Sequence, residues 1–93
     1  MARILLVDDE PLLLESLEII LSISGEHEVC GKAQNGLEAL GLLKDPTCVP
    51  DVMLVDLNMP DMGGNELIPI VKAQYPDIRI IVLTTFYDEQ NIA

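Results

Sequence analysis

Short apolar runs alternate along the chain with segments of helical spacing, and this alternation constrains the fold more than any other feature of the sequence. Short runs that end in polar residues are typical of buried strands, because helices need a longer stretch. The runs expected to be strands cover residues 4–7, 28–33, 52–55 and 78–83. The sequence therefore predicts four strands, each followed by a polar turn.

The segments between the predicted strands place apolar side chains along one helical face. Helices are expected over residues 11–23, 37–43 and 65–74, and a fourth is expected to begin near Asp88. Pro11 suits the first turn of a helix, Asp9 is able to cap it, and Gly25 supplies a stop. Pro46 closes the second helix.

The order of these elements predicts an α/β fold, a doubly wound parallel sheet with helices on both faces. In such folds, ligands bind at the carboxyl ends of the strands, near the point where the strand order reverses. Asp8, Asp9, Asp56 and Thr84 all stand at strand ends. We therefore expect these residues to share one site.

Three carboxylates are expected at this edge of the sheet. Two unit charges that are a few ångströms apart repel by about 4 kcal/mol at an effective dielectric near 20, so a cation is expected among them. Carboxylate, carbonyl and water oxygens suit Mg²⁺. Asp56 would serve as a nucleophile that takes a phosphoryl group, and Thr84 would donate a hydrogen bond to it. The alternative for Asp8 and Asp9 is that they face solvent and cap the following helix.

Three motifs together resemble the receiver domain of bacterial two-component response regulators. They are Ile4–Pro11 (ILLVDDEP), Asp51–Gly64 (DVMLVDLNMPDMGG) and Ile81–Thr85 (IVLTT). The resemblance covers the whole chain, in the family's order and at its separations. It implies a flavodoxin-like receiver fold with strand order 2-1-3-4. The form Leu83-Thr84-Thr85-Phe86 resembles receivers of the NarL type, whose output is usually a C-terminal helix-turn-helix domain.

The resemblance implies two-component signalling, in which a sensor histidine kinase passes a phosphoryl group to Asp56 and thereby switches transcription regulation by the full-length protein. Asp9 matches the carboxylate that binds Mg²⁺ directly, and Asp8 matches its acidic neighbour. Asn58 matches the position whose backbone carbonyl completes the metal site. Thr84 matches the switch hydroxyl that turns toward the phosphoryl group.

Three further positions match residues that shape the site in this family. Thr85 matches the small residue that controls access to the phosphoryl group. Pro60 and Gly64 match the loop beside the site, although both are equally well explained as turn residues.

The resemblance also implies what this sequence lacks. Receiver domains continue through a fifth strand and a fifth helix, and neither their active-site lysine nor their switch aromatic residue has a counterpart here. We expect one receiver domain, residues 1–93, incomplete at its C-terminus. Residues 78–83 would then form a sheet edge despite the composition of a central strand. We expect this surface to produce a homodimer or a swapped oligomer, unless further residues follow that the sequence does not include.

Charge and composition exclude several function classes. Sixteen acidic residues against five basic ones give a net charge of −11, so contact with DNA is expected only through a separate output domain. The N-terminal apolar run is too short for a signal peptide or a membrane span. Cys30 and Cys48 lack metal-binding spacing and are expected to be unpaired thiols, which suits a cytoplasmic protein. His27 is expected to be a solvated turn residue.

Two other functions compete with phosphoryl acceptance. A receiver fold that acts only as a protein-interaction module would carry the same motifs, and phosphate uptake by Asp56 separates the two. A phosphatase of the haloacid dehalogenase type also uses a strand-end aspartate with Mg²⁺, but it requires an aspartate where Asn58 stands. The sequence therefore favours a regulatory domain over an enzyme.

Overall fold

A computed structural model describes residues 2–57, 59 and 62–83 of the chain. Four residues singled out from the sequence lie outside the described residues: Asn58, Pro60, Thr84 and Thr85. The helix expected to begin near Asp88 also lies outside them.

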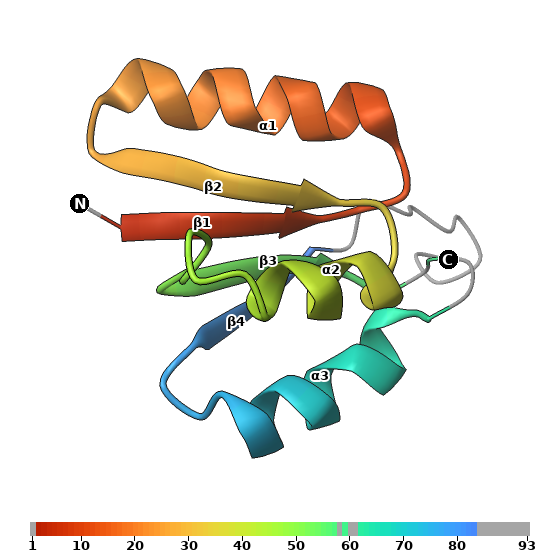
Figure 1. Ribbon diagram of the computed structural model, residues 1–93. Helices are drawn as coiled ribbons and strands as arrows, with labels where there is room; N and C mark the ends of the chain where they lie inside the picture. Colours follow the sequence, from red (N-terminus) through yellow and green to blue (C-terminus); the bar gives the residue numbers. More distant parts are fainter. Residues whose placement is uncertain (1, 58, 60–61, 84–93) are drawn as a thin grey trace, which may run out of the picture.

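The predicted strands are present and form one parallel sheet (Figure 1). The strands are β1 (Ala2–Val7), β2 (His27–Ala33), β3 (Val52–Asp56) and β4 (Arg79–Leu83). Their spatial order is β2-β1-β3-β4, so the predicted order is confirmed. Because neighbouring strands run in the same direction, the carboxyl ends of β1 and β3 lie at one edge of the sheet.

Helices cover both faces of this sheet (Figure 1). They are α1 (Pro11–Ser24), α2 (Gly36–Leu43) and α3 (Gly64–Gln74). Helix α1 packs on one face through Leu14, whereas α2 and α3 pack on the other through Ala39 and Leu67. The prediction of a doubly wound α/β fold is confirmed. Helix α3 begins at Gly64, one residue before its predicted start.

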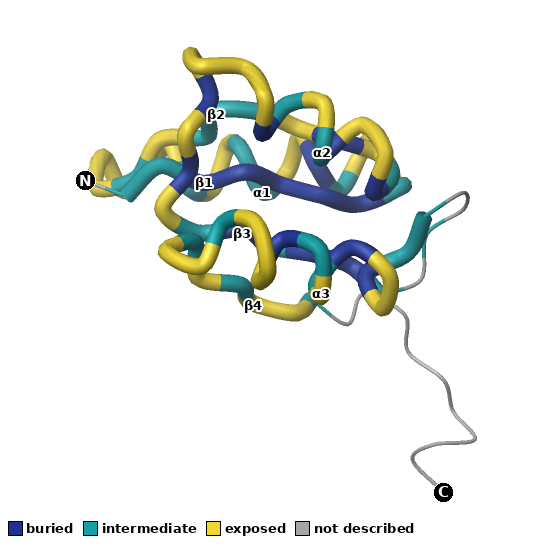
Figure 2. Tube along the Cα trace, turned by 60° about the horizontal axis from the view of Figure 1, so that its bottom comes forward, coloured by how far each residue is buried: buried dark blue, intermediate teal, exposed yellow. Residues whose placement is uncertain are grey.

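Strand β1 is the centre of the fold and supplies side chains to both core layers. Leu5 and Val7 pack with the α2 and α3 layer, and Ile4 and Leu6 pack with α1, because successive side chains of a strand point to opposite faces. These residues are buried, and Figure 2 shows the strand in dark blue over most of its length. The prediction of a fully buried first strand is confirmed.

The ends of α1 agree with the predicted stop but not with the predicted cap. Gly25 follows the helix at φ 70°, the left-handed conformation that favours glycine, and its N–H donates to the Ser22 carbonyl. The expectation that Asp9 caps the helix is wrong, because Glu10 occupies the N-cap position and makes no side-chain cap bond. The N–H of Glu10 instead donates to the Asp8 carboxylate at 2.9 Å.

Strand β2 carries an irregularity opposite the middle of β1. The consecutive residues Ile4 and Leu5 pair with Val29 and Gly31, which are two positions apart. Cys30 is therefore the extra residue of a β-bulge. Such a bulge interrupts the alternation of side chains and re-aims the residue that it contains.

The amino end of β2 differs from the prediction. His27 belongs to the strand, pairs with Ala2 of β1 and is half-buried, so the expectation of a solvated turn residue is wrong. The strand extends one residue beyond the predicted start because the Ala2 N–H donates to the Glu26 carbonyl at 3.3 Å and continues the pairing.

Large apolar side chains are exposed on β4 and on α1. Strand β4 forms one edge of the described sheet, and its Ile81 and Val82 are 52% and 44% exposed. The exposed apolar residues of α1 are Leu12, Ile19, Ile20 and Ile23. Among the described residues, no helix has both the length and the apolar character needed to cross a membrane.

Candidate functional site

The ends of β1 and β3 bring acidic side chains together. Val7 pairs with Val55, so the residues that follow them, Asp8 and Asp56, lie next to each other at the carboxyl edge of the sheet. Asp8 is 0% exposed and Asp56 is 2% exposed. Burying two charged carboxylates on adjacent strands destabilises the fold. A purely structural role therefore does not explain why both stand at this edge of the sheet.

Backbone hydrogen bonds fix Asp8 on both sides. Its N–H donates to the Ala33 carbonyl of β2 at 2.9 Å, and its Oδ1 accepts the Glu10 N–H at 2.9 Å. Its Oδ2 is buried and has no hydrogen-bond partner within the part of the chain that the structure describes. An unpartnered buried polar atom costs about 1–3 kcal/mol, more when it is charged, and a ligand at this oxygen would offset that cost.

The surroundings raise the pKa of the Asp8 carboxyl above its ordinary value. The largest cause is removal from water, which the Glu10 N–H partly counteracts. The negative charges of Asp56, Asp9 and Glu10 raise the pKa further. Because these neighbours are all anionic, a cation among them would relieve both the burial and the repulsion.

Three carboxylates are close enough to bind one ion. The carboxylate oxygens of Asp8, Asp9 and Glu10 lie within 4.8 Å of one another. An all-carboxylate set suits a hard cation such as Mg²⁺, and the Asp8 Oδ2, which has no partner among the described residues, would supply a ligand atom. Glu10 was not among the site residues predicted from the sequence, although a third acid directly after an aspartate pair at a strand end is a signal that could have identified it.

Gly64, the first residue of α3, packs directly against the end of β3. A Cβ atom at this position would lie 2.8 Å from the Asp56 carbonyl oxygen and 3.0 Å from the Leu57 Cα. The Gly64 N–H donates to the Leu57 carbonyl at 3.3 Å. Glycine therefore lets α3 begin this close to Asp56, which gives Gly64 a packing role beside the site.

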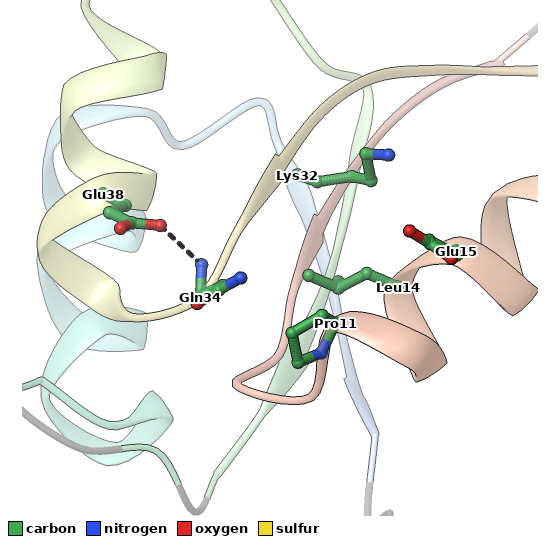
Figure 3. A pocket seen from close by; sticks show the side chains of 6 residues that line it. All are labelled: Pro11, Leu14, Glu15, Lys32, Gln34 and Glu38. Carbon is green, nitrogen blue, oxygen red and sulfur yellow. Dashed lines mark hydrogen bonds between the residues drawn. The ribbon is translucent and has the colours of Figure 1, made fainter.

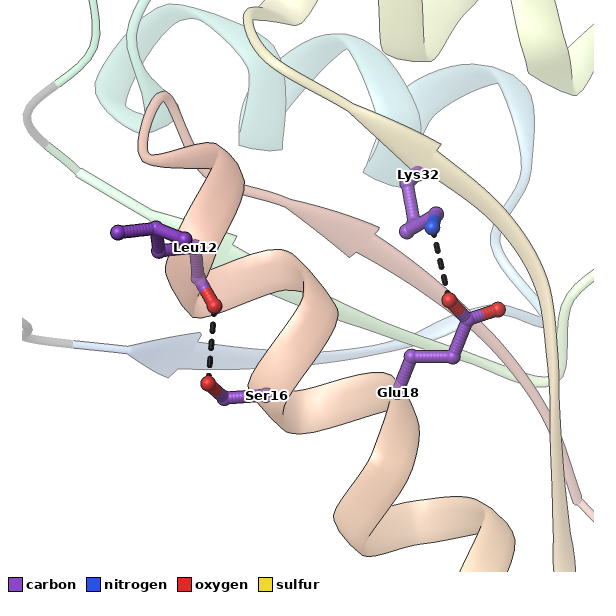
Figure 4. Close-up of polar contacts among 4 residues, drawn as sticks. All are labelled: Leu12, Ser16, Glu18 and Lys32. Atoms are coloured by element: carbon purple, nitrogen blue, oxygen red, sulfur yellow. Dashed lines mark hydrogen bonds and ion pairs between the residues drawn. The ribbon is translucent and has the colours of Figure 1, made fainter.

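A hollow of about 350 Å³ lies between α1 and the turn from β2 to α2 (Figure 3). Its lining residues are Pro11, Leu14, Glu15, Lys32, Gln34 and Glu38. The Lys32 ammonium already pairs with Glu18 of α1 at 2.7 Å (Figure 4), and Glu38 accepts the Gln34 N–H. The hollow therefore has little positive charge to offer an anion, and the acidic edge remains the better candidate site.

The fold and the site define a class: flavodoxin-like α/β proteins with an acidic cluster at the carboxyl edge of a parallel sheet. The chain belongs to the response regulator receiver domain family, whose model matches residues 4–93. The family resemblance predicted from the three motifs is thus confirmed.

Curated relatives include several regulators of transcription. The chain is 36% identical over 90 residues to the transcriptional regulatory protein YhcZ of Bacillus subtilis (strain 168), a match covering 97% of this chain and 41% of that protein. It is 33% identical over 90 residues to DegU of Brevibacillus brevis, covering 97% of this chain and 37% of DegU. The chain thus spans about two fifths of the length of these relatives.

Solved structures of receiver domains superpose on the whole described fold. The receiver domain of a putative NarL from Mycobacterium tuberculosis is 32% identical with a TM-score of 0.81, covering 96% of this chain and 70% of that one. A LuxR-family response regulator from Aurantimonas sp. SI85-9A1 is 28% identical with a TM-score of 0.82, covering 99% and 64%. The predicted resemblance to receivers of the NarL type is therefore confirmed.

Proposed function

We propose that the chain accepts a phosphoryl group on Asp56 from the phosphohistidine of a sensor histidine kinase, and that this switches the output of a transcriptional regulator. The observation that carries the proposal is the buried carboxylate pair at the ends of β1 and β3, in which Asp8 Oδ2 lacks a partner among the described residues. Membership of the receiver family and the names of the curated relatives support it.

In the proposed reaction, a carboxylate oxygen of Asp56 attacks the phosphorus atom of phosphohistidine. The oxygen–phosphorus bond forms as the nitrogen–phosphorus bond breaks, and the imidazole nitrogen leaves with the bonding electron pair. Asp56 is the last residue of a strand, so the β-sheet fixes the direction of the attacking carboxylate. Thr84 would donate its hydroxyl to a phosphoryl oxygen, and Thr85 and Pro60 would shape access to it.

Asp8 and Asp9 would hold Mg²⁺ together with Asp56 and the backbone carbonyl of Asn58. When bound, Mg²⁺ neutralises the negative charge of the transferred phosphoryl group. Glu10 adds a further negative charge within 4.8 Å of the Asp8 and Asp9 oxygens, which strengthens the attraction for the cation.

The kinase has to reach the acidic edge, and among the described residues the first turn of α1 follows directly after the acidic residues and carries an exposed apolar side chain. Leu12 stands two residues after Glu10 and is 78% exposed. The Ser16 hydroxyl donates to the Leu12 carbonyl at 2.9 Å, and the Leu12 side chain points away from β2 (Figure 4). We therefore assign Leu12 to the kinase contact. A Leu12→Asp variant should lose phosphotransfer from the kinase but keep phosphorylation by a small donor.

The second proposed partner is another copy of this chain. Ile81 and Val82 are exposed on β4 at the edge of the described sheet, where unpaired strand groups favour pairing with a second strand. We expect a homodimer or swapped oligomer in sedimentation equilibrium. A stable monomer of 10.2 kDa would contradict this assembly.

The test of phosphoryl acceptance is intact-mass spectrometry after incubation with Mg²⁺ and acetyl phosphate. We expect uptake of one phosphoryl group by the wild type, none by Asp56→Asn, and normal uptake by Asp77→Asn, which removes an exposed carboxylate elsewhere. Circular dichroism establishes that each variant is folded. A folded wild type that takes up no phosphoryl group would refute the proposal and favour the protein-interaction module.

A further inference from the structure

Two cysteines that are distant in the sequence meet on the α2 side of the sheet, away from the acidic site. Cys30 Sγ lies 2.9 Å from Cys48 Sγ, which belongs to the segment between α2 and β3. The two thiols share a hydrogen bond, and neither forms a disulfide. The sulfur atoms of a disulfide are about 2.05 Å apart, so closing this pair requires movement of less than about 1 Å.

The β-bulge of β2 creates this pair. Val29 packs with the core under α1, whereas Cys30 packs with the core under α2 and α3. The following residue, Gly31, faces the same side, and a Cβ there would lie 3.2 Å from Cys48 Sγ. The bulge thus points the Cys30 thiol toward the segment between α2 and β3, and Gly31, which has no side chain, leaves room for the Cys48 thiol.

The loop that carries Cys48 is held by several hydrogen bonds. The Cys48 N–H donates to the Asp45 carbonyl at 3.0 Å, and the Asp45 carboxylate accepts both the N–H and the hydroxyl of Thr47. The Arg3 guanidinium donates to the Thr47 carbonyl at 2.8 Å. These bonds fix the direction of the Cys48 side chain, so the approach of the two sulfur atoms is built into the fold.

We propose that Cys30 and Cys48 are a redox-active dithiol, which closes to an intramolecular disulfide on reaction with a low-molecular-weight disulfide such as glutathione disulfide. In the first step, the Cys30 thiolate attacks glutathione disulfide, a mixed disulfide forms, and one glutathione thiolate leaves. In the second step, the Cys48 thiolate attacks Cys30 Sγ, and the second glutathione leaves. The two cysteines lose two electrons and two protons, which appear in two glutathione molecules.

Exposure sets the order of these steps. Cys48 is 3% exposed, whereas Cys30 is only half-buried and is the thiol that a small oxidant reaches first. Burial and the hydrogen bond with Cys48 raise the pKa of the Cys30 thiol to about 12. Its thiolate is therefore scarce at neutral pH, and the pair responds slowly, to sustained rather than brief oxidation.

The disulfide would enclose α2 in a covalent loop. It would tie β2 to the segment before β3 and would remove conformational freedom from the unfolded chain. The oxidised protein should therefore unfold at a higher temperature than the reduced protein. Because α2 lies inside the loop, its amide protons should also exchange more slowly after oxidation.

The experiment treats the folded full chain with glutathione disulfide and traps the remaining thiols with iodoacetamide before intact-mass analysis. We expect the wild type to lose two hydrogens and take up no alkyl group. Cys48→Ser should stop at the mixed disulfide with one glutathione, because the second attack is removed. Cys30→Ser should form a mixed disulfide at least tenfold more slowly, because Cys48 is buried.

A wild type that keeps two alkylatable thiols in the folded state, while urea-unfolded protein oxidises, would overturn the proposal. So would a disulfide-linked dimer on a non-reducing gel in place of the internal bond. The wild-type comparison of melting temperatures before and after oxidation needs no variant, so the test does not depend on the folding of the serine substitutions. An unchanged melting temperature with both thiols oxidised would refute the expected stabilisation by the covalent loop.

Discussion

Replacing Asp8 by asparagine should stabilise the metal-free protein at neutral pH. Asparagine keeps the Oδ1 atom that accepts the Glu10 N–H, but it removes a buried negative charge. Two unit charges 4.8 Å apart, the separation that bounds this cluster, repel by about 3.5 kcal/mol at an effective dielectric near 20. Because Asp9 and Glu10 are partly or largely exposed, solvent and salt reduce this repulsion, and we expect a gain of about 1–2 kcal/mol.

The stability gained by Asp8→Asn should depend on pH, and the direction of that dependence can be measured. The pKa of Asp8 is raised in the folded state, so the folded protein binds a proton here more tightly than the unfolded chain does. The stability contributed by that proton is present at low pH and is lost as the pH rises through the raised pKa. The advantage of Asp8→Asn should therefore be largest at pH 7 and should shrink as the pH falls toward 3.8.

The assay is thermal unfolding in EDTA at pH 7 and pH 4, where each kcal/mol shifts the melting temperature by about 4–8 °C in a domain of this size. Asp45→Asn is the matched control, because hydrogen bonds from Thr47 lower the pKa of that carboxyl and the same substitution should bring no gain. Added Mg²⁺ should raise the melting temperature of the wild type and have little effect on Asp8→Asn. If Asp8→Asn is no more stable than the wild type in EDTA at pH 7, the Asp8 carboxylate does not carry the unrelieved repulsion that a bound cation would remove.

Three further outcomes follow from the described geometry. Gly64→Ala should destabilise the fold by about 1–3 kcal/mol and slow phosphorylation by acetyl phosphate, because its Cβ would collide with the Asp56 carbonyl; wild-type rates would contradict this. Gly25→Ala should cost about 1 kcal/mol in urea unfolding because φ is 70°, whereas Gly41→Ala, in α2 with open space around it, should stabilise by about 0.5–1 kcal/mol. Oxidation of Cys30 by glutathione disulfide should accelerate about tenfold per pH unit between about pH 7 and 9, because its pKa is about 12, and a flat profile would refute the buried-thiol mechanism.

The order of the elements was readable from local patterns. Buried parallel strands are nearly all apolar, so the run from Ile4 to Val7 stands out from the helical segments around it. The end of α1 at Gly25 could also be predicted from a local rule, because the left-handed residue after a helix is most often glycine. The α2 cap, in which Asn35 accepts the Glu38 N–H, obeys a comparably local rule and could have been predicted.

What the sequence did not reveal depends on contacts between distant segments. The β-bulge at Cys30 results from how β2 fits β1, and nothing in the residues around it signals the extra position. The contact between Cys30 and Cys48 could not be predicted from the sequence, because it depends on this bulge. The failed Asp9 cap has a similar origin, because the buried Asp8 carboxylate accepts the Glu10 N–H, and Glu10 instead of Asp9 occupies the N-cap position of a helix that begins at Pro11 as predicted. Local rules place the acids at the edge, and tertiary packing decides which of them is buried.

The burial difference between β1 and β4 also predicts how the sheet opens and closes. Amides of β1, bonded on both sides and covered on both faces, should exchange with solvent deuterium only on global unfolding, whereas β4 amides should exchange through local opening. Asp8 lies at the end of the rigid strand, and Asp56 ends the strand that pairs with the labile edge. We therefore expect the acidic site to lie at a boundary between a slow-exchanging and a fast-exchanging part of the described sheet. We expect a chemical change at Asp56 to alter the exchange of β4 amides first, because Asp56 pairs with Leu83 of that strand.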